Sequence, residues 1–384
     1  MTTPAANAPN RLGSIQRMRG VAALLVVIAH GIDVAIRHDD TVSVPALAQL
    51  GYFRDFGAIG VDLFFVISGF VMALSTSTLV GSQGAGRFLT LRWIRVAPPY
   101  LIATAAYMAI FYILDRTVPS VSSLWNAVLF IPALDTDRYT YPPIGVGWTL
   151  SFEVTFYLIT AVTVMAVPRR ARAQVLLAVL VILSVLGFAF RPDVYLLSWL
   201  TNPIYLEFAF GVGAYLLWRR GLVTKRHWWW TALGAAAAAS LLLELFVGYG
   251  GSAGDEIFDG ASGATRVFLW GIPSALILTA LLPLKAAGSG LAGRVLQTLG
   301  DASYSIYLVH MLAFVPLEAL LNRMPPTPAG DLVVLVAVLV GVGAGVLYYR
   351  LCERPVTEWL RRGYARRTGE RPHLRPAPVV PPSD

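Results

Sequence analysis

The chain is a succession of long apolar runs separated by short polar segments, and this pattern predicts a membrane protein. About ten of the runs approach the length of about 20 residues that a helix needs to cross the hydrocarbon core of a bilayer. The predicted spans are Met18–Ile36, Gly57–Leu79, Trp93–Leu114, Gly147–Val167, Ala173–Phe190, Thr201–Trp218, Trp228–Val247, Arg266–Leu284, Ser303–Leu321 and Asp331–Leu351. The sequence therefore predicts an all-α fold, a polytopic membrane helical bundle of about ten transmembrane helices.

The polar ends and one long connection complete the predicted domain organisation. Residues 1–10 are polar and rich in proline and alanine, and residues 363–384 are rich in arginine and proline, so both ends are predicted to be disordered. Residues 11–362 then form one transmembrane domain. Between the third and fourth spans, Leu124–Leu134 is too short to cross the membrane and is predicted as a re-entrant or surface helix.

The distribution of charge predicts the orientation of the bundle. Only 14% of the residues are charged, against about 25% in an average soluble domain, and the net charge is +8. Most of the 30 lysines and arginines fall in loops on the same side as the two ends of the chain, whereas ten acidic residues between Asp39 and Asp259 fall on the opposite side. This bias is the positive-inside rule, which places both termini in the cytoplasm and argues against a nucleic-acid partner.

Cysteine and glycine patterns give no sign of a resident cofactor. Cys352 is the only cysteine, which excludes an internal disulfide. The sequence contains no paired cysteine–histidine cluster with zinc-ligand spacing, no P-loop and no dinucleotide-binding glycine pattern. We therefore expect neither a metal site nor a permanently bound cofactor.

The first span carries an ionisable pair that suggests chemistry. Arg19 and His30 are separated by small and apolar residues only, and on a helix they share one face roughly 16 Å apart. A histidine deep in the membrane suggests a functional site, although a neighbouring helix satisfies many such histidines. Asp33 follows on the neighbouring face position, where its carboxylate either fixes the imidazole tautomer, as in a general-base pair, or simply ends the helix.

A second group of cations lies at the start of the third span. Arg92 and Arg95 are three residues apart and share a helical face, and the arginine fork suits the oxygens of a phosphate. Together with Arg19 they form a cluster suited to a polyphosphate. The alternative is an ordinary juxtamembrane anchor that binds lipid headgroups.

Three further spans carry polar residues in apolar surroundings. Thr149, Glu153 and Tyr157 follow at helical spacing, and such a polar stripe faces a cavity or another helix rather than lipid. In the second span Asp62 lies near the outer mouth, between glycines that permit close helix approach. In the ninth span the polar face is formed by Ser303, Tyr307 and His310. His310 is either a second active-site residue or a hydrogen-bonded structural one.

In their order along the chain, these segments resemble the acyltransferase-3 family of bacterial membrane O-acyltransferases. The resemblance covers residues from about 11 to 362. The segments that carry it are Arg19-x10-His30, Gly-Val-Asp-Leu-Phe-Phe-Val-Ile-Ser-Gly-Phe at 60–70, Arg92-x-x-Arg95, Trp148-Thr-Leu-Ser-Phe-Glu153, Ser-Tyr-Ser-Ile-Tyr-Leu-Val-His at 303–310, and Glu353-Arg354-Pro355, which is expected to end the last helix. Residues 145–153 and 65–72 are also similar to the exopolysaccharide acetylase branch of the family.

The resemblance implies transfer of an acyl group, usually acetyl from acetyl-CoA as co-substrate, to a hydroxyl of a glycan or lipid-linked sugar such as exopolysaccharide. Within that expectation Arg19, Arg92 and Arg95 hold the phosphates of acyl-CoA. His30 acts as general base or as acyl carrier, assisted by Asp33 and Glu153. Candidates for contact with the substrate are Asp62, Trp148, Tyr307 and His310.

The sequence leaves two other functions open. Polytopic bundles with buried ionisable residues also occur in transporters and flippases, although no inverted repeat is evident here. The chain is alternatively a non-catalytic component of a glycan-assembly complex. We expect the protein to lie in the bacterial inner membrane as a multi-pass protein. Its expected partners are membrane lipids and glycan-assembly proteins.

Overall fold

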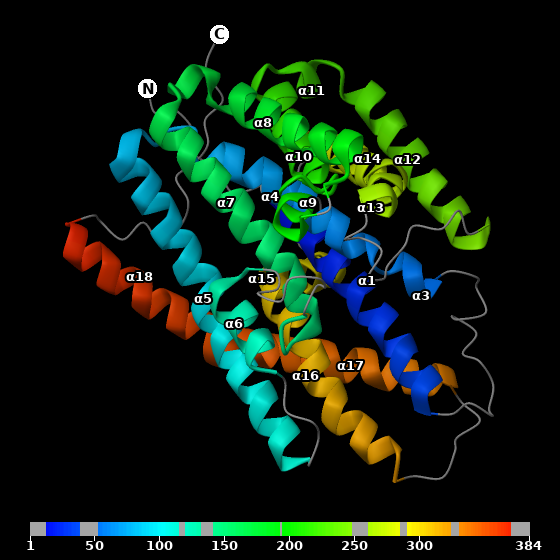
Figure 1. Cartoon of the computed structure of the whole chain (residues 1–384). Coiled ribbons are helices and arrows are strands. Elements are labelled where there is room, and N and C mark those ends of the chain that lie inside the picture. Colours follow the sequence, from blue (N-terminus) through cyan, green and yellow to red (C-terminus); the bar gives the residue numbers. More distant parts are fainter. Residues whose placement is uncertain are drawn as a thin grey trace, which may run out of the picture.

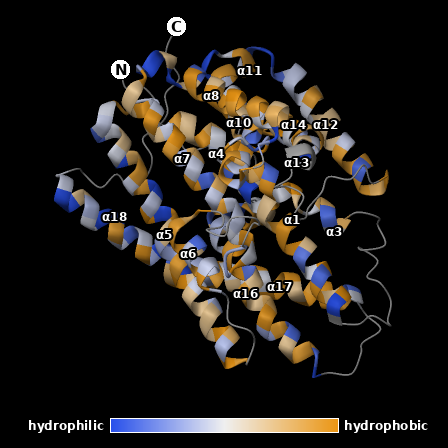
Figure 2. Cartoon of the chain, viewed as in Figure 1, coloured by the Kyte–Doolittle hydropathy of each residue, from blue (hydrophilic) through white to orange (hydrophobic). Residues whose placement is uncertain are grey.

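The computed structural model describes residues 13–38, 53–114, 120–131, 141–192, 194–247, 260–284, 290–323 and 330–369. Every regular element within these ranges is a helix, which confirms the predicted all-α class. The helices pack against one another as a bundle (Figure 1). Apolar residues dominate long helices such as α8 and α17, whereas α18 is rich in polar residues (Figure 2).

The elements follow one another along the chain without a strand in the described part. The first half contains α1 (Gly13–His38), α3 (Phe53–Phe56), α4 (Ile59–Ser75), α5 (Gly81–Ile113), α6 (Val121–Leu129), η1 (Gly145–Gly147), α7 (Trp148–Ala166) and α8 (Arg169–Phe190). The second half contains α9 (Tyr195–Leu200), α10 (Tyr205–Arg219), α11 (Leu222–Lys225), α12 (His227–Val247), α13 (Gly260–Arg266), η3 (Val267–Gly271), α14 (Ile272–Leu281), α15 (Leu291–Asp301), α16 (Ser303–Leu321), α17 (Gly330–Tyr348), η4 (Tyr349–Glu353) and α18 (Arg354–Thr368).

Each of the predicted spans coincides with a helix. Eight helical segments of the described chain are long and apolar enough to cross a membrane. The second and sixth predicted spans form the shorter helices α4 and α10, of 17 and 15 residues, and both are largely buried. Large apolar side chains lie exposed on the outer helices, for example Phe190, which is 74% exposed. Such a surface suits lipid rather than water, so the chain is a multi-pass membrane protein.

Helix α4 is the central element and packs against α1, α7, α10 and α14. The predicted role of its glycines is confirmed. A Cβ atom added at Gly60 would lie 2.3 Å from the carbonyl oxygen of Ala22, and one at Gly69 would lie 2.1 Å from that of Phe208. Because both approaches exclude any side chain, the backbone of α4 is held tightly between α1 and α10.

Two helix ends differ from the prediction. Helix α5 begins at Gly81 rather than at Trp93, so Arg92 and Arg95 lie within a continuous helix. The segment Glu353-Arg354-Pro355 does not end the last helix. Instead, η4 is a π-helical turn and Pro355 lies in the first turn of α18, where a missing backbone N–H costs no hydrogen bond.

The predicted ends of the domain are partly outside the described chain. Helix α18 continues through Thr368, past the predicted start of the tail at Gly363. Residues 1–12 and 370–384, which include the predicted disordered lead, lie outside the described residues. The short segment before the fourth span forms α6, a helix of nine residues that contacts α5. This agrees with the prediction of a helix too short to cross the membrane.

Candidate active site

A cavity opens between α1, α4, α5, α7 and α16, and it gathers many of the predicted site residues. It encloses about 760 Å³ of space, its open mouth included. Three cations, one acid and three tyrosines contribute to its wall. They are Arg19, Arg92, Arg95, Glu153, Tyr157, Tyr304 and Tyr307. Residues that are far apart in the sequence therefore meet at one site, as the predicted arginine cluster requires.

The three arginines have few partners within the protein. The Nε atom of Arg19 donates to Ser303 Oγ at 3.1 Å, and its guanidinium carbon lies 6.0 Å from the ring centroid of Phe64. Arg92 lies over the ring of Phe88 at 5.8 Å. Across the described ranges, no carboxylate oxygen comes within 4.0 Å of a guanidinium nitrogen of Arg19, Arg92 or Arg95. The cavity therefore offers several unused N–H donors and an excess of positive charge, which suits a polyanion.

Glu153 is the acid of the cavity wall, and hydroxyl groups hold its carboxylate. Tyr157 donates a hydrogen bond to Glu153 Oε1, and Ser68 donates to the same oxygen at 3.2 Å. One turn earlier, Thr149 shares a hydrogen bond of 3.0 Å with the hydroxyl of Tyr307. The polar stripe on α7 thus faces the cavity, as its spacing predicts.

His30 lies next to His310 rather than in the cavity wall. The two rings meet edge to face with centroids 5.1 Å apart. His30 Nδ1 lies 3.0 Å from the Val26 carbonyl oxygen, and His310 Nδ1 lies 3.0 Å from that of Ile306. Since a carbonyl oxygen only accepts, Nδ1 carries the proton in each neutral ring and Nε2 keeps a lone pair. His310 is fully buried, and its Nε2 has no hydrogen-bond partner among the residues with described positions.

The histidine pair lies behind one part of the cavity wall. Phe64 and Tyr307 line the cavity, and their ring centroids are 5.8 Å apart. The ring of Tyr307 lies in turn 6.2 Å from that of His310. A series of ring contacts therefore leads from the arginine cavity through Tyr307 and His310 to His30, and neither histidine lines the cavity.

The other predicted residues lie apart from the cavity. Asp33 is half-buried on α1, one turn beyond His30. The hydrogen bond from His30 Nδ1 to the Val26 carbonyl sets the tautomer of the ring, and the role predicted for Asp33 stays a prediction. Trp148 packs against the rings of Phe65 and Phe152, at 6.4 and 5.9 Å.

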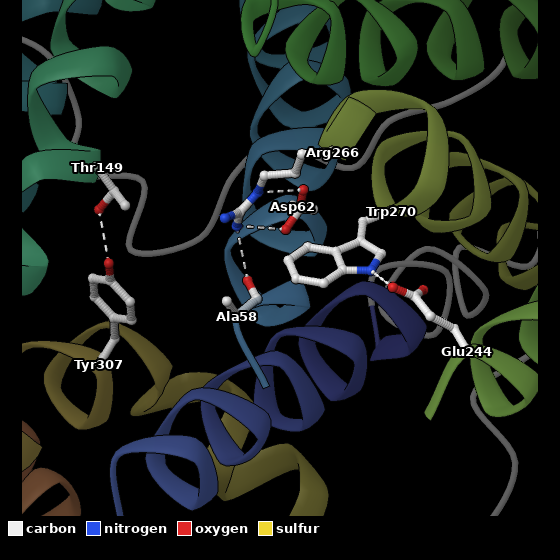
Figure 3. Close-up of polar contacts among 7 residues, drawn as sticks. All are labelled: Ala58, Asp62, Thr149, Glu244, Arg266, Trp270 and Tyr307. Carbon is white, nitrogen blue, oxygen red and sulfur yellow. Dashed lines mark hydrogen bonds and ion pairs between the residues drawn. The ribbon is translucent and has the colours of Figure 1, made fainter. Parts of the chain in front are cut away.

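Asp62 belongs to a sealed ion pair. Arg266 donates to Asp62 through Nε at 3.0 Å and through Nη2 at 2.8 Å, and also to the carbonyl of Ala58 at 3.1 Å. The side chains of Arg266 and Asp62 are only 1% and 0% exposed. Figure 3 shows this pair together with Trp270, whose Nε1 donates to Glu244 at 2.7 Å, away from the Thr149–Tyr307 hydrogen bond. Asp62 thus contributes to helix packing rather than to the cavity wall.

Two polar residues of this region have partners that sequence reasoning did not identify. Arg266, at the start of the eighth predicted span, is buried and paired with Asp62. The signal available in the sequence was that both residues lie near the start of predicted spans that begin on the same side of the membrane, and so lie at similar depth. Ser68 donates to Glu153.

The comparisons with known proteins agree with the resemblance found in the sequence. The acyltransferase 3 family, described as an acyltransferase domain, matches residues 12–349 of the chain. ExoZ, the exopolysaccharide production protein of Rhizobium meliloti, is 32% identical over 326 residues, or 84% of this chain and 95% of the relative. The acyltransferase MdmB of Streptomyces mycarofaciens is 26% identical over 392 residues, or 92% of this chain and 93% of the relative.

A third relative and the structural comparison complete the findings. Nodulation protein 10 of Rhizobium leguminosarum bv. viciae is 28% identical over 289 residues, or 69% of this chain and 74% of the relative. No solved structure matches the chain. Since the family match spans most of the sequence, the chain belongs to the acyltransferase 3 family and is a multi-pass membrane acyltransferase.

Proposed function

We propose that this protein transfers an acetyl group from acetyl-CoA to a hydroxyl of a cell-surface glycan, such as exopolysaccharide, at the bacterial inner membrane. The observation that carries the proposal is the cavity in which three arginines meet that have no carboxylate partner among the described residues. The similarity to ExoZ, a protein named for exopolysaccharide production, favours a glycan acceptor. Membership of an acyltransferase family favours this function over transport or scaffolding.

The donor site follows from the charge and shape of the cavity. Acetyl-CoA carries a diphosphate and a 3′-phosphate, and Arg19, Arg92 and Arg95 supply forked donors for such groups. The remaining wall is largely apolar and includes Val61, which suits the pantetheine arm. Donor binding in this orientation directs the thioester into the bundle, towards the histidine pair.

His30 is the proposed base. Its Nε2 lone pair removes the proton from the acceptor hydroxyl while the alcohol oxygen attacks the thioester carbonyl carbon. Collapse of the tetrahedral intermediate breaks the carbon–sulfur bond, and the imidazolium proton passes to the departing thiolate. In an alternative route, Nε2 takes the acetyl group itself and passes it to the alcohol. Glu153, in the cavity wall, is proposed to return the imidazole to its neutral form or to bind the acceptor.

The test is acetyl transfer by purified protein in lipid nanodiscs, with acetyl-CoA labelled in the acetyl group and a sugar acceptor. We expect His30→Ala to lower transfer by a factor of about 10² or more, because general-base catalysis contributes that much, while acetyl-CoA binding persists. His227→Ala is the matched control, since His227 begins α12 and is exposed. Unchanged transfer in His30→Ala would remove the catalytic assignment.

Two further measurements complete this test. Acetyl label that stays on the protein without acceptor, and disappears in His30→Ala, identifies the carrier route rather than the base route. The O-acetyl content of surface glycans, compared between cells with and without the protein, identifies the acceptor. Equal O-acetyl content together with no acetyl-CoA binding would instead support one of the functions that do not involve acyl transfer.

A further inference from the structure

The proposed reaction requires a path from the arginines to His30 that the cavity itself does not provide. The arginines line the cavity, whereas neither His30 nor His310 contributes to its wall. Two rings of the wall, those of Phe64 and Tyr307, contact each other, and Tyr307 also lies next to His310. For a thioester to pass from the arginines towards His30, one of these two rings has to move.

Tyr307 is not the ring that moves. Its hydroxyl donates to the carbonyl oxygen of Val146 at 2.9 Å and lies 3.0 Å from the hydroxyl of Thr149. The side chain is also buried, with 6% exposed. Moving it would break both of these hydrogen bonds, which is costly in an apolar bundle.

Phe64 has no comparable restraint. Its side chain is half-buried and carries no hydrogen-bonding group, and its described contacts include the edge of Tyr307 and the guanidinium of Arg19. The α4 backbone around it cannot shift, because Gly60 and Gly69 are packed against neighbouring carbonyl groups. Any opening is therefore confined to a rotation of the Phe64 side chain between staggered rotamers.

Arg19 links this ring to the donor. Its guanidinium lies 6.0 Å from the centroid of Phe64, within the range of a cation–π contact. A phosphate that draws the guanidinium towards itself weakens this contact. Donor binding and release of the ring are thus coupled through one side chain.

We propose that Phe64 is a specificity-determining residue that separates the arginine cavity from the His30–His310 pair and limits the length of the acyl group that passes. The proposal rests on the function proposed above, because it assumes that a CoA thioester occupies the cavity. It predicts that the size of residue 64, rather than the strength of donor binding, sets which acyl group is transferred.

The first experiment measures transfer rates with acetyl-, butyryl- and hexanoyl-CoA. Phe64→Ala is expected to raise the hexanoyl-to-acetyl ratio of kcat at least tenfold. Phe64→Trp is expected to lower acetyl kcat at least tenfold, with the Kd for acetyl-CoA within twofold of the parent. Phe65→Leu is the matched control, since the next ring on α4 also lines the cavity but packs against Phe208 at 4.6 Å, and it should leave the chain-length ratio unchanged.

The second experiment measures how fast the acyl end of a CoA thioester reaches position 30, without requiring acyl transfer. In a Cys352→Ser background, bromoacetyl-CoA is offered to the thiol introduced by His30→Cys. Attack of the thiolate on the bromomethyl carbon forms a carbon–sulfur bond and releases bromide, so intact-protein mass spectrometry reports arrival at position 30. We expect Phe64→Trp to slow this alkylation at least tenfold, Phe64→Ala to accelerate it, and unmodified CoA to compete.

The outcomes separate this inference from the function on which it rests. If CoA binds and the alkylation rate and chain-length ratio do not depend on residue 64, the role of Phe64 is overturned and the proposed function stands. If position 30 is not alkylated in any of the variants although CoA binds, the passage itself is overturned. If neither acetyl-CoA nor CoA binds, both proposals are overturned. Phe64→Leu replaces Phe64→Ala if the smaller side chain prevents folding.

Discussion

Two sets of arginines in this bundle differ in how their donors are used. The buried Arg266 gives its donors to Asp62 and to the main chain. The buried Arg172 likewise donates to four main-chain carbonyl oxygens, those of Thr76, Leu79, Val164 and Val167. The half-buried arginines of the cavity use few of their donors within the described part of the chain.

The difference separates arginines that hold helices together from arginines that we propose bind a ligand. A guanidinium whose partners are all internal contributes to stability, and its removal leaves those partners unsatisfied. A guanidinium that faces an open cavity with few partners adds repulsion among like charges, which only an anion relieves. The comparison predicts that mutations in the first set lower the free energy of unfolding, whereas mutations in the second set weaken the binding of the proposed donor.

The largest expected effect is on stability, in Arg266→Ala. Removal of this arginine leaves Asp62 as an unpaired charge in a buried position, which costs about 3–5 kcal/mol of the free energy of unfolding. The measurement is an SDS-unfolding titration of the purified protein. The paired replacement Arg266→Leu with Asp62→Leu should recover most of this loss. A stability equal to that of the parent in Arg266→Ala would show that the ion pair does not hold the bundle.

The next effect is on ligand binding, in Arg92→Ala and Arg95→Ala. Each replacement removes charge-assisted hydrogen bonds to phosphate and should raise the Kd for acetyl-CoA about tenfold, with little change in the unfolding titration. Arg87→Ala is the matched control, since Arg87 lies on the same helix but outside the cavity wall. Affinities equal to the parent's would leave these arginines only an anchoring role at the membrane.

The smallest expected effect is that of ionic strength. Raising the salt concentration shortens the screening length and should weaken acetyl-CoA binding a few-fold at the open arginine cavity. The sealed Arg266–Asp62 pair is shielded from mobile ions, so the unfolding titration of an Asp62→Asn variant should differ from that of the parent by the same amount at both salt concentrations. A binding constant independent of salt would argue against phosphate recognition by the cavity.

Much of this architecture was accessible from the sequence. Apolar length located the spans, and helical spacing placed Arg92 and Arg95 on one helical face and Thr149, Glu153 and Tyr157 along one polar stripe. Both inferences depend on local geometry that the chain repeats in every turn. The same rules do not give helix ends, because a helix such as α5 continues into polar sequence as long as its backbone hydrogen bonds continue.

The sequence could not show which side chains from different helices contact one another. Spacing placed Arg19 and His30 on one face of α1, but it did not reveal that Phe64 and Tyr307, from two other helices, line the cavity or that Tyr307 lies next to His310. The pairing of Asp62 with Arg266 was hidden for the same reason, since the two residues are 204 positions apart. Such contacts depend on how helices pack rather than on the pattern within any of them.

The length of α5 has a consequence for how the proposed donor, which is soluble in water, reaches a cavity within the membrane. Its 33 residues make a rod of about 50 Å, whereas the hydrocarbon core is about 30 Å thick. Part of α5 therefore extends beyond the hydrocarbon core, and the polar helix α18 packs against α5. We propose that the two helices form a surface beyond the bilayer on which the adenine end of the CoA donor rests in water while the thioester end reaches the interior.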